Sequence, residues 1–166
     1  CAYAKGVEVV SREEAVTRLK AALLARDELR SRTGLDLVVV GRTDVRRASF
    51  EEGDQAALEE ALTRCMVFEK LGADIVYAEG LKSLEEMRAL CSRLKPETPK
   101  MLAQVEGGSA SKLLSADELA PLGFKLCLFG VTLLNAQLFA ATRVTKGIAN
   151  GQHPEVGREL LPFKDL

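Results

Sequence analysis

Four short apolar runs alternate with segments of helical periodicity, and this alternation constrains the fold more than any other feature of the chain. The runs are LDLVVV (35–40), ADIVYAE (73–79), KMLAQV (100–105) and FKLCLFG (124–130). The segments whose apolar residues recur at helical spacing are 11–30, 54–71, 83–94, 115–122 and 133–148. The resulting order α-β-α-β-α-β-α-β-α, with short connections, predicts a parallel sheet with right-handed crossovers.

Local signals mark the ends of these elements. Ser11 precedes two acidic residues, as an N-cap does, and Gly72 follows the second helical segment, as a C-cap does. Pro96 closes the third helical segment, and Gly123 closes the fourth. The run at 35–40 is apolar at most positions and rich in valine, which predicts a strand buried on both faces.

Two folds fit this order of elements. One is a small open α/β sheet, and the other is the C-terminal half of a (β/α)₈ TIM barrel, whose usual length of about 250 residues exceeds this chain. The chain has 166 residues and begins with Cys1 instead of a methionine. We therefore favour the half-barrel, and we expect residues 1–166 to be a single partial domain that the N-terminal half of the same barrel completes.

Composition excludes several classes of protein. The 23 lysines and arginines balance 24 acidic residues and are scattered, which argues against nucleic-acid binding. No apolar run approaches the roughly 18 residues of a membrane span. The four cysteines have no C-x-x-C spacing, and Cys65, Cys91 and Cys127 fall within apolar patterns. They predict reduced core thiols in an intracellular compartment, which is cytoplasmic or organellar.

Polar residues follow three of the four predicted strands. The first strand leads into Arg42, Thr43 and Asp44, the second ends at Glu79, and the third leads into Glu106, Gly107 and Gly108. The fourth is followed only by Gly130, Val131 and Thr132. In a TIM barrel the active site lies at the C-terminal ends of the strands. These residues therefore predict a site at that edge of the sheet.

Arg42, Glu79 and Asp44 suit the binding of a small acid. Arg42 carries a forked, permanently charged group suited to a substrate carboxylate, although a structural salt bridge would also explain it. Glu79 is a candidate catalytic residue that orients Arg42 or accepts a hydrogen bond from a substrate hydroxyl; equally, it neutralises that arginine. We expect Asp44 to cap the following turn and to hold Arg42 in place.

The third strand ends in a second group of candidates. Glu106 supplies a carboxylate, and the two glycines after it allow the backbone to approach a ligand closely, although a plain turn is the alternative. Ser109 and Ser111 are candidate donors to a substrate carboxylate. His153, the sole histidine of the sequence, lies in a Gly- and Pro-containing tail and is expected to be a solvated loop residue.

The segments around these candidates resemble a known superfamily. The matching stretches are VVVGRTD, FEKLGADIVYAEG, PKMLAQVEGG and LSADELAPLGFKLCLFGVTLL. In order and spacing they resemble the isocitrate lyase and phosphoenolpyruvate mutase superfamily over nearly the whole chain. The resemblance is strongest to the plant-type carboxyvinyl-carboxyphosphonate phosphorylmutase branch and to the methylisocitrate and dimethylmalate lyases.

The resemblance implies a Mg²⁺-dependent lyase of C–C bonds, or a P–C mutase, that acts on a small α-keto or α-hydroxy carboxylic acid through an enolate-like pyruvate intermediate. Cys1 would be the acid–base cysteine of the catalytic loop, which reads K-[KR]-C-G-H in the lyases. The Mg²⁺ ligands would lie on strands of the N-terminal half, with none in this segment. A homotetramer with exchanged C-terminal helices is also implied, for which 133–141 offers an apolar stretch, although that stretch is equally suited to covering its own barrel.

The sequence departs from the family pattern near the expected site. Ala2 and Tyr3 replace the Gly-His that follows the cysteine, and Ala103 replaces an asparagine of the third strand unless Gln104 serves instead. Ser111-Lys112 replaces Thr-Pro, and Phe129-Gly130 replaces Tyr-Pro. Two hypotheses therefore remain: an active lyase or mutase of altered specificity, and a catalytically degenerate member that serves as a structural or assembly subunit.

Overall fold

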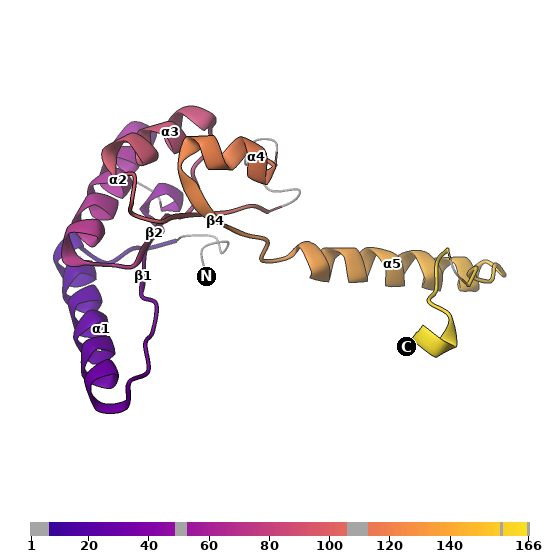
Figure 1. Ribbon diagram of the computed structural model, residues 1–166. Helices are drawn as coiled ribbons and strands as arrows, with labels where there is room; N and C mark the ends of the chain where they lie inside the picture. Colours follow the sequence, from indigo (N-terminus) through magenta and orange to yellow (C-terminus); the bar gives the residue numbers. More distant parts are fainter. Residues whose placement is uncertain (1–6, 49–52, 106–112, 157, 166) are drawn as a thin grey trace. The chain divides into compact units, whose positions relative to one another are not determined.

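The computed structural model describes residues 7–48, 53–105, 113–156 and 158–165. The chain divides into two compact units, of which the first ends at Leu128 and the second begins at Phe129 (Figure 1). The expected alternation of helices and strands is confirmed in the first unit, which holds the sheet.

Among the described residues, the first unit contains a four-stranded parallel sheet. Its strands are β1 (Val40–Thr43), β2 (Ile75–Ala78), β3 (Lys100–Ala103) and β4 (Phe124–Leu128). The α-helices of this unit are α1 (Arg12–Thr33), α2 (Asp54–Leu71), α3 (Leu84–Arg93) and α4 (Ala116–Leu119). Two short 3₁₀ helices, η1 (Val45–Arg47) and η2 (Ala120–Leu122), follow β1 and α4.

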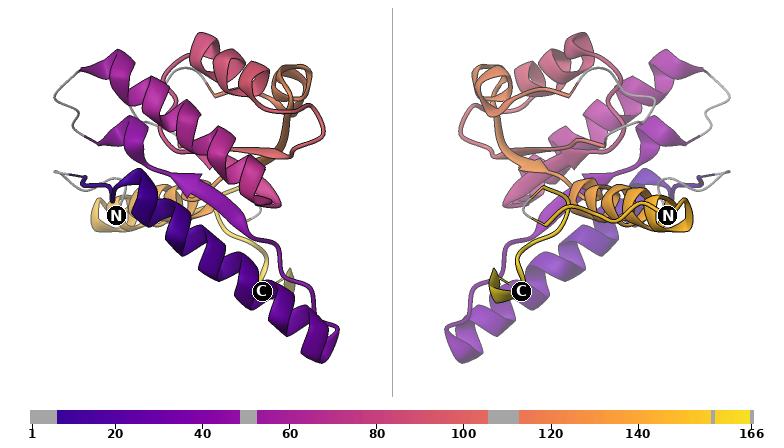
Figure 2. Two further views of the ribbon diagram at one scale, coloured as in Figure 1. Left: turned by 90° about the vertical axis from the view of Figure 1, so that its left-hand side faces the viewer. Right: turned by 90° about the vertical axis from the view of Figure 1, so that its right-hand side faces the viewer.

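The order of the strands separates the two folds that the sequence left open. The strands lie side by side in the order β1-β2-β3-β4 and are parallel. Right-handed crossovers that always advance in one direction place every connecting helix on the same face of the sheet, whereas a doubly wound sheet reverses direction. Helices α2, α3 and α4 accordingly cover one face of the strands (Figure 2). This arrangement is that of a half-barrel.

Serine side chains fix the starts of three helices, as the sequence indicated for α1. The hydroxyl oxygens of Ser11 and Ser83 accept hydrogen bonds from backbone N–H groups three residues later, at 3.1 and 3.3 Å. Ser115 and Glu118 form a reciprocal capping box at the start of α4. Gly72 ends α2 with a φ of 94°, a left-handed conformation that glycine adopts without strain.

The first strand differs from the sequence-based expectation. It covers Val40–Thr43 instead of 35–40, so that Arg42 lies within the strand and not beyond its end. The backbone pairs with β2 only from Val40, opposite Ile75. Because no strand of the described part of the chain pairs with the preceding segment, its apolar residues do not become buried as expected. The exposed residues are Leu35, Leu37 and Val38.

The core of the first unit lies between the sheet and the helices. Its fully buried members include Leu62 and Cys65 of α2, Val76 of β2 and Leu90 of α3. On the opposite face the apolar residues Val40, Leu126 and Leu128 remain exposed. The sheet thus has one face covered by helices and another face on which these apolar residues are exposed, as expected of the inner face of an incomplete barrel.

Cysteine burial agrees in part with the expectation of core thiols. Cys65 is fully buried, whereas Cys91 and Cys127 are partly buried and pack against the core. All three are free cysteines. The compartment that we inferred from them stays a prediction.

The second unit consists of α5 (Thr132–Ala149), a following segment and the 3₁₀ helix η3 (Phe163–Asp165). No residue of α5 is buried, and its exposed residues include Leu133, Leu134, Leu138 and Phe139. Among the described residues, no helix has the length and the apolar character that a membrane span requires.

Gly41 offers a test of the packing between sheet and helix. A Cβ atom at this position would lie 2.9 Å from the Cβ atom of Phe68 and 3.1 Å from that of Ala73. We expect Gly41→Ala to lower the free energy of unfolding by about 1–3 kcal/mol, because overpacking forces neighbours to move. The control is Gly130→Ala, where no atom lies within 4 Å of the added methyl group. Urea titrations of both variants that give equal midpoints would contradict this packing.

Candidate functional site at the C-terminal edge of the sheet

The structure brings Arg42, Asp44 and Glu79 together. Register pairs Arg42 of β1 with Tyr77 of β2, and Glu79 lies two residues further along on the same face. The Nε atom of Arg42 donates to Oδ1 of Asp44 at 2.6 Å, and Nη2 donates to Oδ2 at 3.2 Å. The same Nη2 lies 3.4 Å from Oε2 of Glu79. One guanidinium thus contacts both carboxylates.

Glu79 is a buried carboxylate supported from several sides. Its side chain is 5% exposed, and its Oε2 accepts a hydrogen bond from the Tyr77 hydroxyl. The ring of Tyr77 also lies 5.1 Å from the guanidinium carbon of Arg42, within the range of a cation–π contact. The side chain of Arg42 remains 42% exposed. The arrangement holds the cation in one orientation while leaving part of it open to a ligand.

Asp44 differs in part from its expected role. It contacts Arg42 as described, but its side chain makes no capping hydrogen bond to the turn that follows. The hydroxyl of Thr43 accepts a 3.4 Å hydrogen bond from the backbone N–H of Val45 instead. The expected capping by Asp44 is therefore wrong, because Arg42 engages both carboxylate oxygens.

A second arginine reaches Glu79 from the turn after β1. The Nη1 atom of Arg47 lies 3.9 Å from Oε1 of Glu79. Its aliphatic stem crosses Gly80, where a Cβ atom would lie 2.3 Å from Cγ of Arg47. Gly80 has a φ of 86°, so the position favours glycine for its backbone conformation as well as for space. Arg42 and Arg47 therefore lie against opposite oxygens of one buried carboxylate.

Arg46, between these residues, anchors the turn to the helices. Its buried guanidinium donates to Asp54 at 2.8 and 3.0 Å and to Glu86 at 2.7 and 3.1 Å. Asp54 begins α2 and also accepts a hydrogen bond from Nζ of Lys82 at 2.7 Å. The hydrogen bonds from Arg46, and then those from Lys82, hold the pKa of Asp54 well below its usual value. The network fixes η1, and with it Arg47, relative to α2 and α3.

Gln104 has a structural role in the loop after β3. Its side-chain oxygen accepts from the backbone N–H of Leu114 at 2.6 Å, and its side-chain nitrogen donates to the Leu114 carbonyl at 2.7 Å. The same nitrogen lies 3.2 Å from the sulfur of Cys127. Its amide is thus engaged within the chain, and the structure offers no support for Gln104 as a substitute for the asparagine that Ala103 replaces.

Several predicted site residues lie outside the described residues: Cys1, Glu106, Gly107, Gly108, Ser109 and Ser111. Their roles stay predictions. Cys65 is no substitute for Cys1 as an acid–base group, because burial raises the pKa of its thiol to about 12. At neutral pH that thiol remains protonated.

The described residues do not form a magnesium site. No three His, Cys, Asp or Glu side chains of the described residues are grouped so that they could hold a metal ion. The two carboxylates at the edge, Asp44 and Glu79, direct their oxygens at arginines, whereas Mg²⁺ requires carboxylate or water oxygens around it. The expectation that the ligands lie on other strands stays a prediction.

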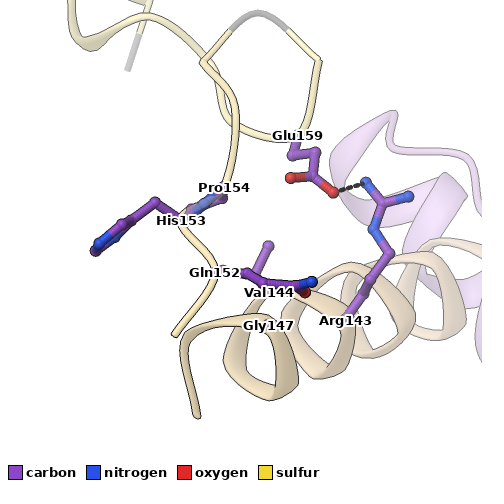
Figure 3. Close-up of a pocket in the computed structure, with 7 residues that line it drawn as sticks. All are labelled: Arg143, Val144, Gly147, Gln152, His153, Pro154 and Glu159. Atoms are coloured by element: carbon purple, nitrogen blue, oxygen red, sulfur yellow. Dashed lines mark ion pairs between the residues drawn. The ribbon is translucent and has the colours of Figure 1, made fainter. Parts of the chain in front are cut away.

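The second unit contains a small cavity of about 90 Å³ between the end of α5 and the segment that follows (Figure 3). An ion pair of 2.9 Å between Arg143 and Glu159 borders it. His153 also lines it, but its ring points away from that ion pair in Figure 3, and the residue is exposed. Glu159 thus offsets the charge of Arg143 at this cavity.

Sequence reasoning missed Tyr77, Arg46 and Arg47. The two-residue period of a β-strand could have identified Tyr77, because a residue two positions before Glu79 lies on the same face of the strand as Glu79. Arg46 and Arg47 follow β1 directly, but their partners Asp54, Glu86 and Glu79 come from other elements. No local pattern indicates those pairings.

The chain is similar to known proteins over most of its length. Residues 3–149 match the family model described as phosphoenolpyruvate phosphomutase. A 2-methylisocitrate lyase from Aeropyrum pernix is 31% identical over 89% of this chain and 42% of its own length. The chloroplastic carboxyvinyl-carboxyphosphonate phosphorylmutase of Arabidopsis thaliana is 28% identical over 100% of this chain and 45% of its own length.

Solved structures agree with these relatives. A structure of oxaloacetate acetylhydrolase with the inhibitor 3,3-difluorooxalacetate has a TM-score of 0.82 and 26% identity, covering 99% of this chain and 51% of that chain. The chain thus spans about half the length of the proteins it matches. Together with the strand order, this coverage confirms the half-barrel interpretation.

The Arg46 network predicts a pH dependence of stability. Because the pKa of Asp54 is lower in the folded chain than its unfolded value of about 3.9, its ion pairs stabilise the fold above that value. This contribution is lost as the pH falls below about 5. We expect Asp54→Asn to be less stable than the parent at neutral pH and to lose less stability on acidification. Urea midpoints across this range measure both effects, with Glu97→Gln, an exposed carboxylate outside the network, as the control.

Proposed function

Because the chain belongs to the phosphoenolpyruvate phosphomutase family, we propose that it forms half of the barrel of a lyase or mutase acting on a small α-keto or α-hydroxy carboxylic acid. Its relatives include lyases and a phosphorylmutase. The proposed reaction cleaves a C–C bond, or transfers a phosphoryl group between carbon and oxygen, through an enolate-like pyruvate intermediate.

One observation carries this proposal: Arg42 is held by Asp44 and Glu79 at the C-terminal edge of the sheet, with nearly half of its side chain still exposed. An arginine held in this way provides a preorganised cation for a substrate carboxylate. Preorganisation matters because a cation already in place stabilises developing negative charge without a reorganisation cost.

The other residues have supporting roles in the proposal. Glu79 orients Arg42, since its Oε2 accepts a hydrogen bond from Tyr77 and lies 3.4 Å from Nη2 of Arg42. Cys1 supplies the acid–base group, as the resemblance implies. Glu106, Gly107, Gly108 and Ser111 complete the substrate-binding edge beyond β3. Mg²⁺ would supply further charge stabilisation, and its ligands would come from strands outside this chain.

A catalytically degenerate assembly subunit is the second candidate, and Gln104 favours it. The family's asparagine is Ala103 here, and the neighbouring amide of Gln104 is engaged by Leu114. Loss of one polar contact in such a site typically costs about a hundredfold in rate. A chain that keeps its core but has lost such contacts would still assemble.

Both candidates require partners for exposed apolar surface. The uncovered face of the sheet includes Val40, Leu126 and Leu128, and we propose that the N-terminal half of the barrel covers it. Exposed apolar residues of α5, among them Leu133 and Phe139, fit an exchange of helices between subunits of a homotetramer. Packing of α5 on its own barrel is the alternative.

A substrate panel distinguishes the enzyme from the assembly subunit. The full-length protein, with all the sequence its gene encodes, would be incubated with 2-methylisocitrate, 2,3-dimethylmalate and oxaloacetate in the presence of Mg²⁺. We expect 2-methylisocitrate or 2,3-dimethylmalate to release pyruvate, or oxaloacetate to release oxalate or pyruvate, and we expect a chelator to abolish this release. If none of the three substrates releases product at high enzyme concentration, the result supports the assembly role.

Arg42→Lys tests the proposed carboxylate contact. Lysine keeps the charge but loses the forked geometry that contacts Asp44 and Glu79 together. We expect kcat/KM on the active substrate to fall by about a hundredfold. Arg88→Lys, an exposed arginine of α3, is the matched control and is expected to leave kcat/KM unchanged. Equal kcat/KM values for the two variants would show that Arg42 does not contact the substrate.

A further inference from the structure

We propose that Asn150, at the end of α5, is a site of spontaneous deamidation whose rate is set by the opening of the last helical turn. In this reaction the backbone nitrogen of Gly151 attacks the side-chain carbon Cγ of Asn150, the new N–C bond closes a succinimide ring, and ammonia leaves. Water then opens the ring to aspartate or to isoaspartate. The inference is independent of the proposed function, because it concerns the second unit alone.

The sequence separates Asn150 from the other asparagine of the chain. The chain has two asparagines, Asn135 and Asn150, and only Asn150 is followed by glycine. Glycine has no Cβ atom, so its nitrogen approaches a neighbouring carbonyl carbon with little hindrance, whereas Ala136 after Asn135 carries a methyl group. Asn150 and Gly151 are exposed, which gives water and hydroxide access to them. Asn135 is also exposed and therefore serves as an internal control.

The cap of α5 holds the attacking nitrogen in an unreactive state. Gly151 has a φ of 75°, and its N–H donates to the carbonyl oxygen of Ile148 at 3.0 Å. The N–H of Gln152 donates to the carbonyl oxygen of Gly147 at 2.9 Å, which completes a Schellman motif with Asn150 as the C-cap residue. The nitrogen of Gly151 must lose its proton before it attacks, and base removes that proton only after the hydrogen bond opens.

The last turn of α5 has little packing that would keep it closed. No residue of α5 is buried in the described structure. Most of the stability of a helix in a protein comes from the packing of one face, and helix ends open before helix interiors do. Asn150 therefore reacts in the folded protein, but more slowly than in an unfolded chain. Asn135 lies inside α5, where its own backbone N–H donates to Val131 at 2.8 Å.

Either product of the reaction weakens the cap. Aspartate at position 150 places a negative charge beside the carbonyl oxygens at the C-terminal end of α5, where the helix dipole disfavours it. Isoaspartate routes the backbone through the former side chain and adds a methylene group before Gly151, so that the hydrogen bonds of the Schellman motif are lost. Gly147 and Gln152 also line the cavity of the second unit (Figure 3), and the modification therefore alters this cavity.

Peptide mapping by mass spectrometry tests the site in the full-length protein. Samples are incubated in weakly alkaline buffer, folded or in guanidinium chloride, and digested at acidic pH, and chromatography separates the aspartate and isoaspartate peptides. In the folded protein we expect conversion at Asn150 and none at Asn135. We expect the folded rate at Asn150 to be about tenfold below the rate in denaturant, which corresponds to about 1.4 kcal/mol for opening the turn.

Ala149→Gly loosens the last turn and leaves both reacting residues in place. Because glycine has a lower helix propensity than alanine, we expect the folded rate at Asn150 to rise about fivefold and the rate in denaturant to stay unchanged. Hydrogen exchange of the Gly151 amide should accelerate by the same factor, since the same opening limits both reactions. Ala21→Gly, at an exposed position of α1 in the first unit, is the matched control and should change neither rate.

The inference is overturned if Asn150 stays intact in the folded protein, or if it reacts there as fast as in denaturant. It is also overturned if Asn135 converts at the same rate as Asn150, or if Ala149→Gly leaves the folded rate unchanged. None of these measurements requires turnover of a substrate. Their outcome is therefore separate from that of the substrate panel.

Discussion

The buried carboxylate of Glu79 is the constraint on which the candidate site depends. A carboxylate that is removed from water needs cations or hydrogen-bond donors around it, and Tyr77, Arg42 and Arg47 supply them. Because these partners come from β1, β2 and the turn after β1, the burial of one charge determines the relative positions of three segments. The same contacts give Arg42 a fixed orientation, which a flexible surface arginine lacks.

The parallel sheet imposes a second constraint, because its connecting helices cover only one of its two faces. All the helices that connect its strands fall on one face, since each right-handed crossover advances in the same direction. The other face keeps Val40, Leu126 and Leu128 exposed. Exposed apolar surface of this kind is covered in stable proteins. The chain spans about half of the proteins it matches, in agreement with a barrel whose other half lies outside this chain.

Particular residues show where sequence reasoning succeeded and where it could not. Glu79 and Arg42 were identified because polar residues near the ends of parallel strands meet at one edge, a rule that needs only the order of elements. The boundary of β1 was wrong because apolar composition does not reveal where a neighbouring strand begins to pair. The hydrogen bonds from Arg46 to Asp54 and Glu86 could not be predicted from the sequence, since they join residues up to 40 positions apart.

The sequence by itself determined the alternation of helices and strands, the serine cap of α1 and the family, because these depend on local periodicity, local hydrogen bonding and motif spacing. Only the tertiary structure decided which arginines share Glu79 and that Gln104 is engaged by Leu114. The physical reason is that a charged or amide side chain has the same local signature whether it faces water, a ligand or a distant partner. Its role is set by what the fold brings within a few ångströms of it.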